Sequence, residues 1–173
     1  MSDKLEEIIS NKQKEVDQLI EYEKQNKSLE KILNRKVLNR HHFKDALKVA
    51  GLSIIAEIKR KSPSKGDLAP ILDPVKLAHT YSKAGAAAIS VLTDQNYFGG
   101  HIDDLMHVSR GLTSLHPCPI LRKDFIIHPY QIAQSKKIGA SAVLLIVAAL
   151  KDRLKEFLDI ANHIGIDALV EVH

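Results

Sequence analysis

The fold of this chain is decided by residues 53–66, whose sequence is Ser-Ile-Ile-Ala-Glu-Ile-Lys-Arg-Lys-Ser-Pro-Ser-Lys-Gly. Side chains alternate between the two faces of a strand, so Glu57 and Lys59 must share one face. Apolar residues on both faces earlier in the strand are typical of a parallel sheet that is covered on both sides. The stretch predicts a buried strand with two ionisable groups at its carboxyl end. These groups are either a structural ion pair or part of a chemical site.

The composition is that of a soluble globular protein. The chain has 173 residues, of which 45% are hydrophobic and 27% are charged, enough for one substantial core. Its longest apolar run, residues 142–150, is far shorter than the ~20 residues that a membrane helix needs. The charged N-terminus does not resemble a signal peptide. We therefore predict a cytoplasmic protein without a membrane partner.

Charge and residue usage argue against nucleic-acid and metal partners. The formal net charge is +4, but only residues 59–65 are locally basic, and aromatic side chains suited to stacking on bases are few. Cys118 is the only cysteine, which excludes an intrachain disulfide and a cysteine-based metal site. Eight of the nine histidines show no paired spacing with acids that would make a metal site, so we expect surface or capping roles for them and no metal. His173 follows Glu171 by two residues and would share its face.

The first fifty residues have a helical pattern and differ from the rest. Apolar residues recur at spacings of three, four and seven over residues 3–25, and shorter helical patterns cover residues 28–38 and 42–49. We expect a helical extension over residues 1–52 and a second unit over residues 53–173. The extension is a helical hairpin, a dimerising arm or a lid over the second unit.

The second unit repeats a strand followed by a helix. Asp73-Pro74 is a capped helix start and Gly85 is its stop. We predict further strands at residues 86–93, 119–123, 141–147 and 167–172, helices at 102–115, 128–138 and 151–164, and a loop at 94–101. Short glycine links between helix and strand favour parallel pairing with right-handed crossovers, hence an α/β fold. Of the two common architectures, a doubly wound sheet and a barrel, we favour the barrel because polar residues follow several strands.

Four ionisable residues stand at the predicted strand ends: Glu57, Lys59, Lys123 and Glu171. Each alone has a plain explanation, such as a surface lysine or a frayed terminal residue. Together they would face one mouth of the barrel. Neighbouring carboxylates favour the charged form of an amine and a second amine disfavours it, so such a set suits a lysine that acts as a general acid.

Five motifs carry a resemblance to a known family. Residues 55–66, 90–94 with 97–100, 121–126, 144–147 and 169–173 resemble indole-3-glycerol-phosphate synthase in order and spacing. The resemblance implies a (β/α)8 TIM barrel, here with about five parallel strands plus the N-terminal helical extension. It also implies a carbon-carbon lyase of tryptophan biosynthesis that acts without metal or organic cofactor. The substrate would be 1-(2-carboxyphenylamino)-1-deoxyribulose 5-phosphate, which closes to the indole ring with release of carbon dioxide and water.

The resemblance also implies roles for the strand-end residues. Lys123 would be the general acid that activates the sugar carbonyl. Lys59 would hold the substrate carboxylate and share in acid catalysis, and the division of proton roles between the two lysines stays open. Glu171 would be the base of the closing dehydration, and Glu57 would keep the lysines charged.

Substrate contacts follow from the same resemblance. Ser62, in the loop after the first strand, would bind the phosphate, while Phe98 and Phe125 would wall the anthranilate ring. As core residues the two phenylalanines would be equally ordinary.

The motifs stop after the fifth strand, whereas an eight-stranded barrel takes roughly 250 residues. In the family, further strands bring an asparagine, a glutamate, a serine and most of the phosphate contacts. We therefore expect a truncated synthase with impaired turnover. Its first and fifth strands would have open edges that allow self-association. The alternative is a non-catalytic, self-associating half-barrel. A third idea, another phosphosugar barrel enzyme, would not call for the Glu-x-Lys strand and its basic loop.

Overall fold

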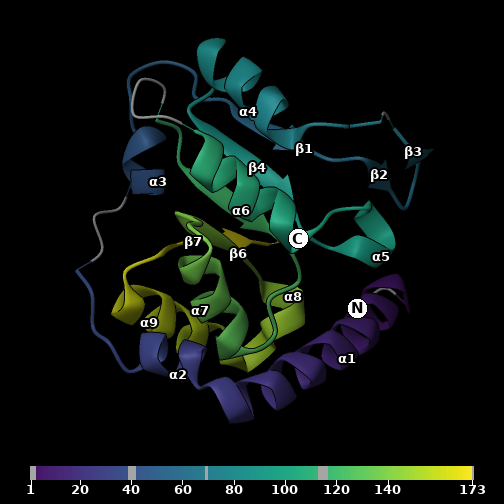
Figure 1. The fold of residues 1–173 in the computed structure, drawn as a ribbon, viewed down its shortest axis with the longest axis vertical. Coiled ribbons are helices and arrows are strands. Elements are labelled where there is room, and N and C mark those ends of the chain that lie inside the picture. Colours follow the sequence, from purple (N-terminus) through teal and green to yellow (C-terminus); the bar gives the residue numbers. More distant parts are fainter. Residues whose placement is uncertain (1–2, 39–41, 69, 113–116, 173) are drawn as a thin grey trace.

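The computed structural model describes residues 3–38, 42–68, 70–112 and 117–172. At its centre is a parallel sheet of five strands in the order β1-β4-β5-β6-β7 (Figure 1). The strands are β1 (Ile55–Ile58), β4 (Ala88–Leu92), β5 (Ile120–Lys123), β6 (Ala142–Ile146) and β7 (Asp167–Glu171). Each pairs in parallel with the next of these strands along the chain, which confirms the α/β fold and the five parallel strands.

Four helices follow the strands in turn and pack on one face of the sheet: α4 (Pro74–Lys83), α6 (Ile102–Gly111), α7 (Pro129–Lys137) and α9 (Leu154–Ile164). The carboxylate of Asp73 accepts the backbone N–H of Lys76 at 2.9 Å and so caps α4 as predicted. Because side chains alternate along each strand, Ile89 and Val91 join the core beneath these helices. Ala88 belongs to a second core on the opposite face.

The structure corrects two predictions about loops. Residues 94–101 contain a short helix, α5 (Gln95–Phe98), because the Asp94 side chain caps its start and Gly99, with a φ of +63°, ends it. The basic loop after the first strand contains a hairpin of β2 (Lys61–Ser62) and β3 (Gly66–Asp67). The two strands pair antiparallel across a short turn, and the apolar pattern of the sequence did not indicate this pairing.

Several predicted helices are shorter than their patterns suggested. Helix α2 (Ser28–Leu33) ends early because the chain leaves the helix for tertiary contacts, and the Val37 N–H pairs with the carbonyl of His163. Helix α3 (His42–Ala46) stops before residue 49, and α6 stops at Gly111, while residues 113–116 lie outside the described residues. Residues 151–164 form a 3-10 turn, η1 (Lys151–Arg153), before α9, and α8 (Val147–Leu150) precedes this turn.

The N-terminal extension packs against the sheet unit of its own chain. Helix α2 contacts α7 and α9, and α1 (Asp3–Asn26) runs past α7 (Figure 1). Phe43 of α3 is buried in the second core, and the N–H groups of Phe43 and Lys44 donate to the carboxylate of Asp167 at 3.1 and 3.0 Å. These helices therefore contact the sheet unit, and the division of the chain at residue 52 stays a prediction.

The two end strands of the sheet, β1 and β7, each pair with one neighbour among the described residues. Apolar side chains are exposed beside them, with Leu52 at 89%, Ile54 at 57% and Val172 at 71%. An open, partly apolar edge can template pairing with another chain. Self-association through these edges stays a prediction.

Gly100 lets the α5 segment return onto the end of β4. Its N–H donates to the Asp94 carbonyl at 2.9 Å, and an added Cβ would lie 2.1 Å from the Leu92 carbonyl oxygen. We expect Gly100→Ala to lower the free energy of unfolding by about 1–3 kcal/mol, the usual cost of overpacking. Urea unfolding checks this, with Gln95→Ala on exposed α5 surface as the control. Equal stabilities of the two variants would contradict the packing argument.

Candidate functional site

The carboxylate of Glu57 connects the two predicted lysines at the carboxyl ends of β1 and β5. Its Oε1 lies 2.7 Å from Lys59 Nζ, and its Oε2 accepts a hydrogen bond from Lys123 Nζ at 3.0 Å. The three side chains are partly buried, with exposed fractions of 26% to 37%. The strand alternation that predicted Glu57 and Lys59 on one face is confirmed, and Lys123 joins them from the strand two places along the sheet.

The environment of Glu57 favours its ionised form. Burial alone would raise the pKa of this carboxyl, but hydrogen bonds from Lys59 and Lys123 and the charges of both amines hold the pKa below its ordinary value. Glu57 therefore stays an anion at neutral pH.

Lys123 also lines a cavity of about 190 Å³ at the same end of the sheet. Phe98, Phe125 and Glu171 line it too, together with apolar side chains from the inner faces of β4 and β6. The rings of Phe98 and Phe125 are tilted at 36°, with centroids 6.2 Å apart. These two phenylalanines, which we call the ring wall, give the cavity an apolar side beside the ammonium group of Lys123 and the carboxylate of Glu171.

Three predicted residues, Glu57, Lys59 and Ser62, are not among the residues that line this cavity. Lys59 is connected to it through Glu57 and is not among its lining residues. Ser62 lies in the β2–β3 hairpin, where its buried hydroxyl accepts the N–H of Lys65 at 3.2 Å. The hairpin is attached to α6 by the ion pair between Arg60 and Asp104. The structure thus brings four of the seven predicted residues to one cavity. Two more, Glu57 and Lys59, are connected to it, because Glu57 pairs with both Lys123 and Lys59.

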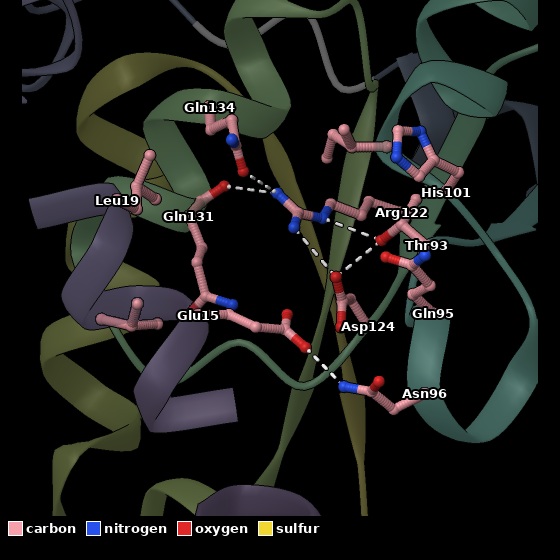
Figure 2. A pocket seen from close by; sticks show the side chains of 12 residues that line it. Glu15, Leu19, Thr93, Gln95, Asn96, His101, Arg122, Asp124, Gln131 and Gln134 are labelled. Carbon is pink, nitrogen blue, oxygen red and sulfur yellow. Dashed lines mark hydrogen bonds and ion pairs between the residues drawn. The ribbon is translucent and has the colours of Figure 1, made fainter. Parts of the chain in front are cut away.

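Sequence reasoning missed the residues on the other face of β5. Arg122, on the opposite face of β5 from Lys123, points into a polar pocket beneath α1 (Figure 2). Asp124, which follows the strand, lines both this pocket and the cavity of Lys123. Arg122 donates to Asp124 at 2.9 Å and to Thr93 at 3.1 Å, and further bonds reach the Gln131 carbonyl and the side chains of Gln134 and Ser135. This face supports the strand end that carries Lys123.

Asp124 is a buried anion. Burial would raise the pKa of its carboxyl, but the charges of Arg122 and Lys12 and a hydrogen bond from Thr93 hold the pKa well below its usual range. Its Oδ1 also accepts the N–H of Phe125 at 2.8 Å, which fixes the backbone next to the ring wall.

Two of the histidines have capping roles, as expected. His101 accepts the N–H of Asp103 at the start of α6, and His128 accepts the N–H of Tyr130 at the start of α7. In the part of the chain that the structure describes, no three His, Cys, Asp or Glu side chains gather as a metal site would require. None of the helices described there has the length and apolar character to span a membrane.

The fold and this mouth define a protein of the (β/α)-barrel type, with ionisable side chains where parallel strands end. A family model described as indole-3-glycerol phosphate synthase matches residues 5–173. The chain belongs to the indole-3-glycerol phosphate synthase family.

Curated relatives carry the same name. The chain is 47% identical over 170 residues to an indole-3-glycerol phosphate synthase of Leptospira interrogans, covering 98% of this chain and 62% of that protein. A synthase of Caldanaerobacter subterraneus is 47% identical over 169 residues, with 98% and 63% covered. One of Nocardioides sp. is 54% identical over 133 residues, with 76% and 48% covered. The chain therefore spans less than two thirds of the length of these relatives.

Proposed function

We propose that this chain supplies the acid–base and ring-binding part of an indole-3-glycerol phosphate synthase site. The activity would be the lyase reaction of tryptophan biosynthesis. In it, 1-(2-carboxyphenylamino)-1-deoxyribulose 5-phosphate closes to the indole ring and loses carbon dioxide and water. The observation that carries the proposal is the shared carboxylate of Glu57, which bonds both Lys59 and Lys123 at the edge of the cavity.

Lys123 is the general acid of this proposal. Its ammonium group lines the cavity and is 3.0 Å from an ionised carboxylate, so it enters the reaction with a proton to give. It donates this proton to the oxygen of the sugar carbonyl while the aromatic carbon that bears the carboxylate attacks the carbonyl carbon. Loss of carbon dioxide then returns the bonding electrons to the ring.

Lys59 and Glu171 serve the other polar ends of the substrate. Lys59, 2.7 Å from Glu57, is a cation at the rim that can pair with the substrate carboxylate before it leaves. Glu171 also lines the cavity and would take a proton from the ring-closed intermediate, while one of the two lysines gives a proton to the hydroxyl group that leaves as water. Glu57 keeps both lysines charged.

The substrate ring and phosphate take separate places. The ring wall of Phe98 and Phe125 offers an apolar surface on which the anthranilate ring can lie. Ser62 is assigned to the phosphate, with the basic side chains of the β2–β3 hairpin nearby in sequence. The proposed steps are acid–base steps, for which the amines and carboxylates of the chain are suited.

The proposal is tested with a chimera in which residues 1–173 replace the matching segment of the Leptospira interrogans relative. Formation of the indole ring is followed by its absorbance after addition of the carboxyphenylamino-deoxyribulose phosphate. We expect turnover that depends on Lys123. A folded chimera that gives no indole absorbance, while the parent relative is active, would overturn the proposal.

A further inference from the structure

Helix α1 places a buried lysine, Lys12, beside the carboxyl ends of β4 and β5. Lys12 is 2% exposed, and its Nζ lies 2.9 Å from Asp124 Oδ1, 3.0 Å from Asp94 Oδ2 and 2.7 Å from Glu15 Oε2. Burial alone would lower the pKa of this amine, but the charges of Asp124 and Asp94 and the hydrogen bond to Glu15 hold the pKa above its ordinary value. A buried ammonium with this many charged partners is an ordered junction between α1 and two strand ends.

Both buried carboxylates of this junction continue to the ring wall. Asp94 follows β4, and its Oδ1 accepts the N–H of Tyr97 at 2.8 Å, which caps the helix that carries Phe98. Asp124 follows β5 and accepts the N–H of Phe125 at 2.8 Å. Phe98 therefore lies within one helical turn of Asp94, and Phe125 directly follows Asp124. Lys12 binds both of these carboxylates.

More contacts come from the same face of α1. Glu7, Asn11 and Glu15 are spaced by four residues, so they share one side of the helix. The Tyr97 hydroxyl bonds the side chains of Glu7 and Asn11, and Asn96 donates to Glu15 at 3.1 Å (Figure 2). Helix α1 thus binds α5 through three side chains on one of its faces.

We propose that Lys12 is a positioning residue, whose ion pairs with Asp94 and Asp124 hold the ring wall in place. Lys12 acts on the ring wall through two segments. These are α5, which Asp94 caps, and the end of β5, which Asp124 follows. The consequence for the substrate rests on the proposed function, because only a ring-binding site needs the wall in a fixed position. The placement of the wall itself does not rest on that function.

A charge-balanced double variant and a matched control separate the loss of positioning from the effect of an unbalanced buried charge. Among the four buried groups, Lys12 and Arg122 carry two positive charges and Asp94 and Asp124 two negative ones. Lys12→Met leaves one negative charge in excess, which can unfold the protein. Adding Asp94→Asn restores neutrality, and asparagine keeps the cap on α5. Lys24→Met is the matched control, since Lys24 is an exposed lysine of the same helix that pairs only with Glu21 among the residues described.

The experiment is fluorine NMR of the 173-residue chain labelled with fluorophenylalanine. The four signals come from Phe43, Phe98, Phe125 and Phe157, and single Phe→Leu variants assign them. In the double variant we expect the Phe98 and Phe125 signals to shift and broaden, and the Phe43 and Phe157 signals to stay as in the parent. Unchanged Phe98 and Phe125 signals would overturn the proposal, as would an equal change of all four signals, which marks a general loss of structure.

Anthranilate binding gives the second measurement. The parent and the Lys24→Met control are expected to quench anthranilate fluorescence with the same dissociation constant, and the double variant to bind about tenfold more weakly. Equal binding by all three proteins would overturn the positioning role. A parent that does not bind anthranilate would speak against the proposed function instead, and the fluorine signals would still decide whether Lys12 places the wall.

Discussion

Lys123→Met is expected to lower turnover of the chimera at least about 100-fold, since general acid catalysis usually contributes that much or more. Methionine keeps the length of the side chain but cannot donate a proton. The loss should appear in kcat, because the proton is given in the transition state and the ring wall still binds the substrate.

The control is Lys155→Met, which removes an exposed lysine of α9 that is 84% accessible and pairs with Asp159. Its turnover should equal that of the parent chimera. If Lys123→Met stayed within about tenfold of the parent, the acid role of Lys123 would be wrong.

Asp124→Asn is expected to destabilise the 173-residue chain by about 3–5 kcal/mol, the cost of removing one partner from a buried ion pair. The carboxylate accepts bonds from Thr93, Arg122 and Phe125 and pairs with Lys12. An amide can accept at only one atom, so it would leave buried cations without an anion. Urea unfolding at neutral pH measures the loss, and Asp159→Asn, in the exposed pair with Lys155, should cost less than about 1 kcal/mol.

The same variant makes a prediction for acid pH. The folded-state pKa of Asp124 lies below its value in the unfolded chain, which is about 3.9. Its contribution to stability is therefore present above about pH 4 and is lost as the pH falls through the folded-state pKa. The stability difference between parent and Asp124→Asn should be constant near neutral pH and shrink in acid. A difference that grows toward acid pH would contradict this assignment.

Local patterns predicted the parts of the fold that depend on local chemistry. The period of two in residues 53–59 placed Glu57 and Lys59 on one face, and their contact at 2.7 Å follows from it. Asp73 with Pro74 marked the start of α4, and the structure shows the predicted cap. The convergence of Lys123 and Glu171 on one cavity followed from the rule that parallel strands end at one edge.

Contacts between distant segments had no comparable signal. Lys12 and Asp124 are 112 positions apart, and on α1 the lysine looked like one more charge of an amphipathic helix. The motif at residues 121–126 drew attention to Lys123, although its neighbours Arg122 and Asp124 are the more deeply buried. The helix α5 did have a signal, since Asp94 is a good N-cap residue, but four residues are too few for an apolar period.

The central claim is that Glu57 and Lys123 act as one cluster. A double-mutant cycle tests it, with turnover of the chimera measured for Glu57→Gln, Lys123→Met and the variant carrying both. If the carboxylate acts by keeping the lysine charged, the double variant should be little slower than Lys123→Met alone. Losses that multiply, so that the double variant is slower by the product of the two single effects, would show that the two side chains act independently and would contradict the account.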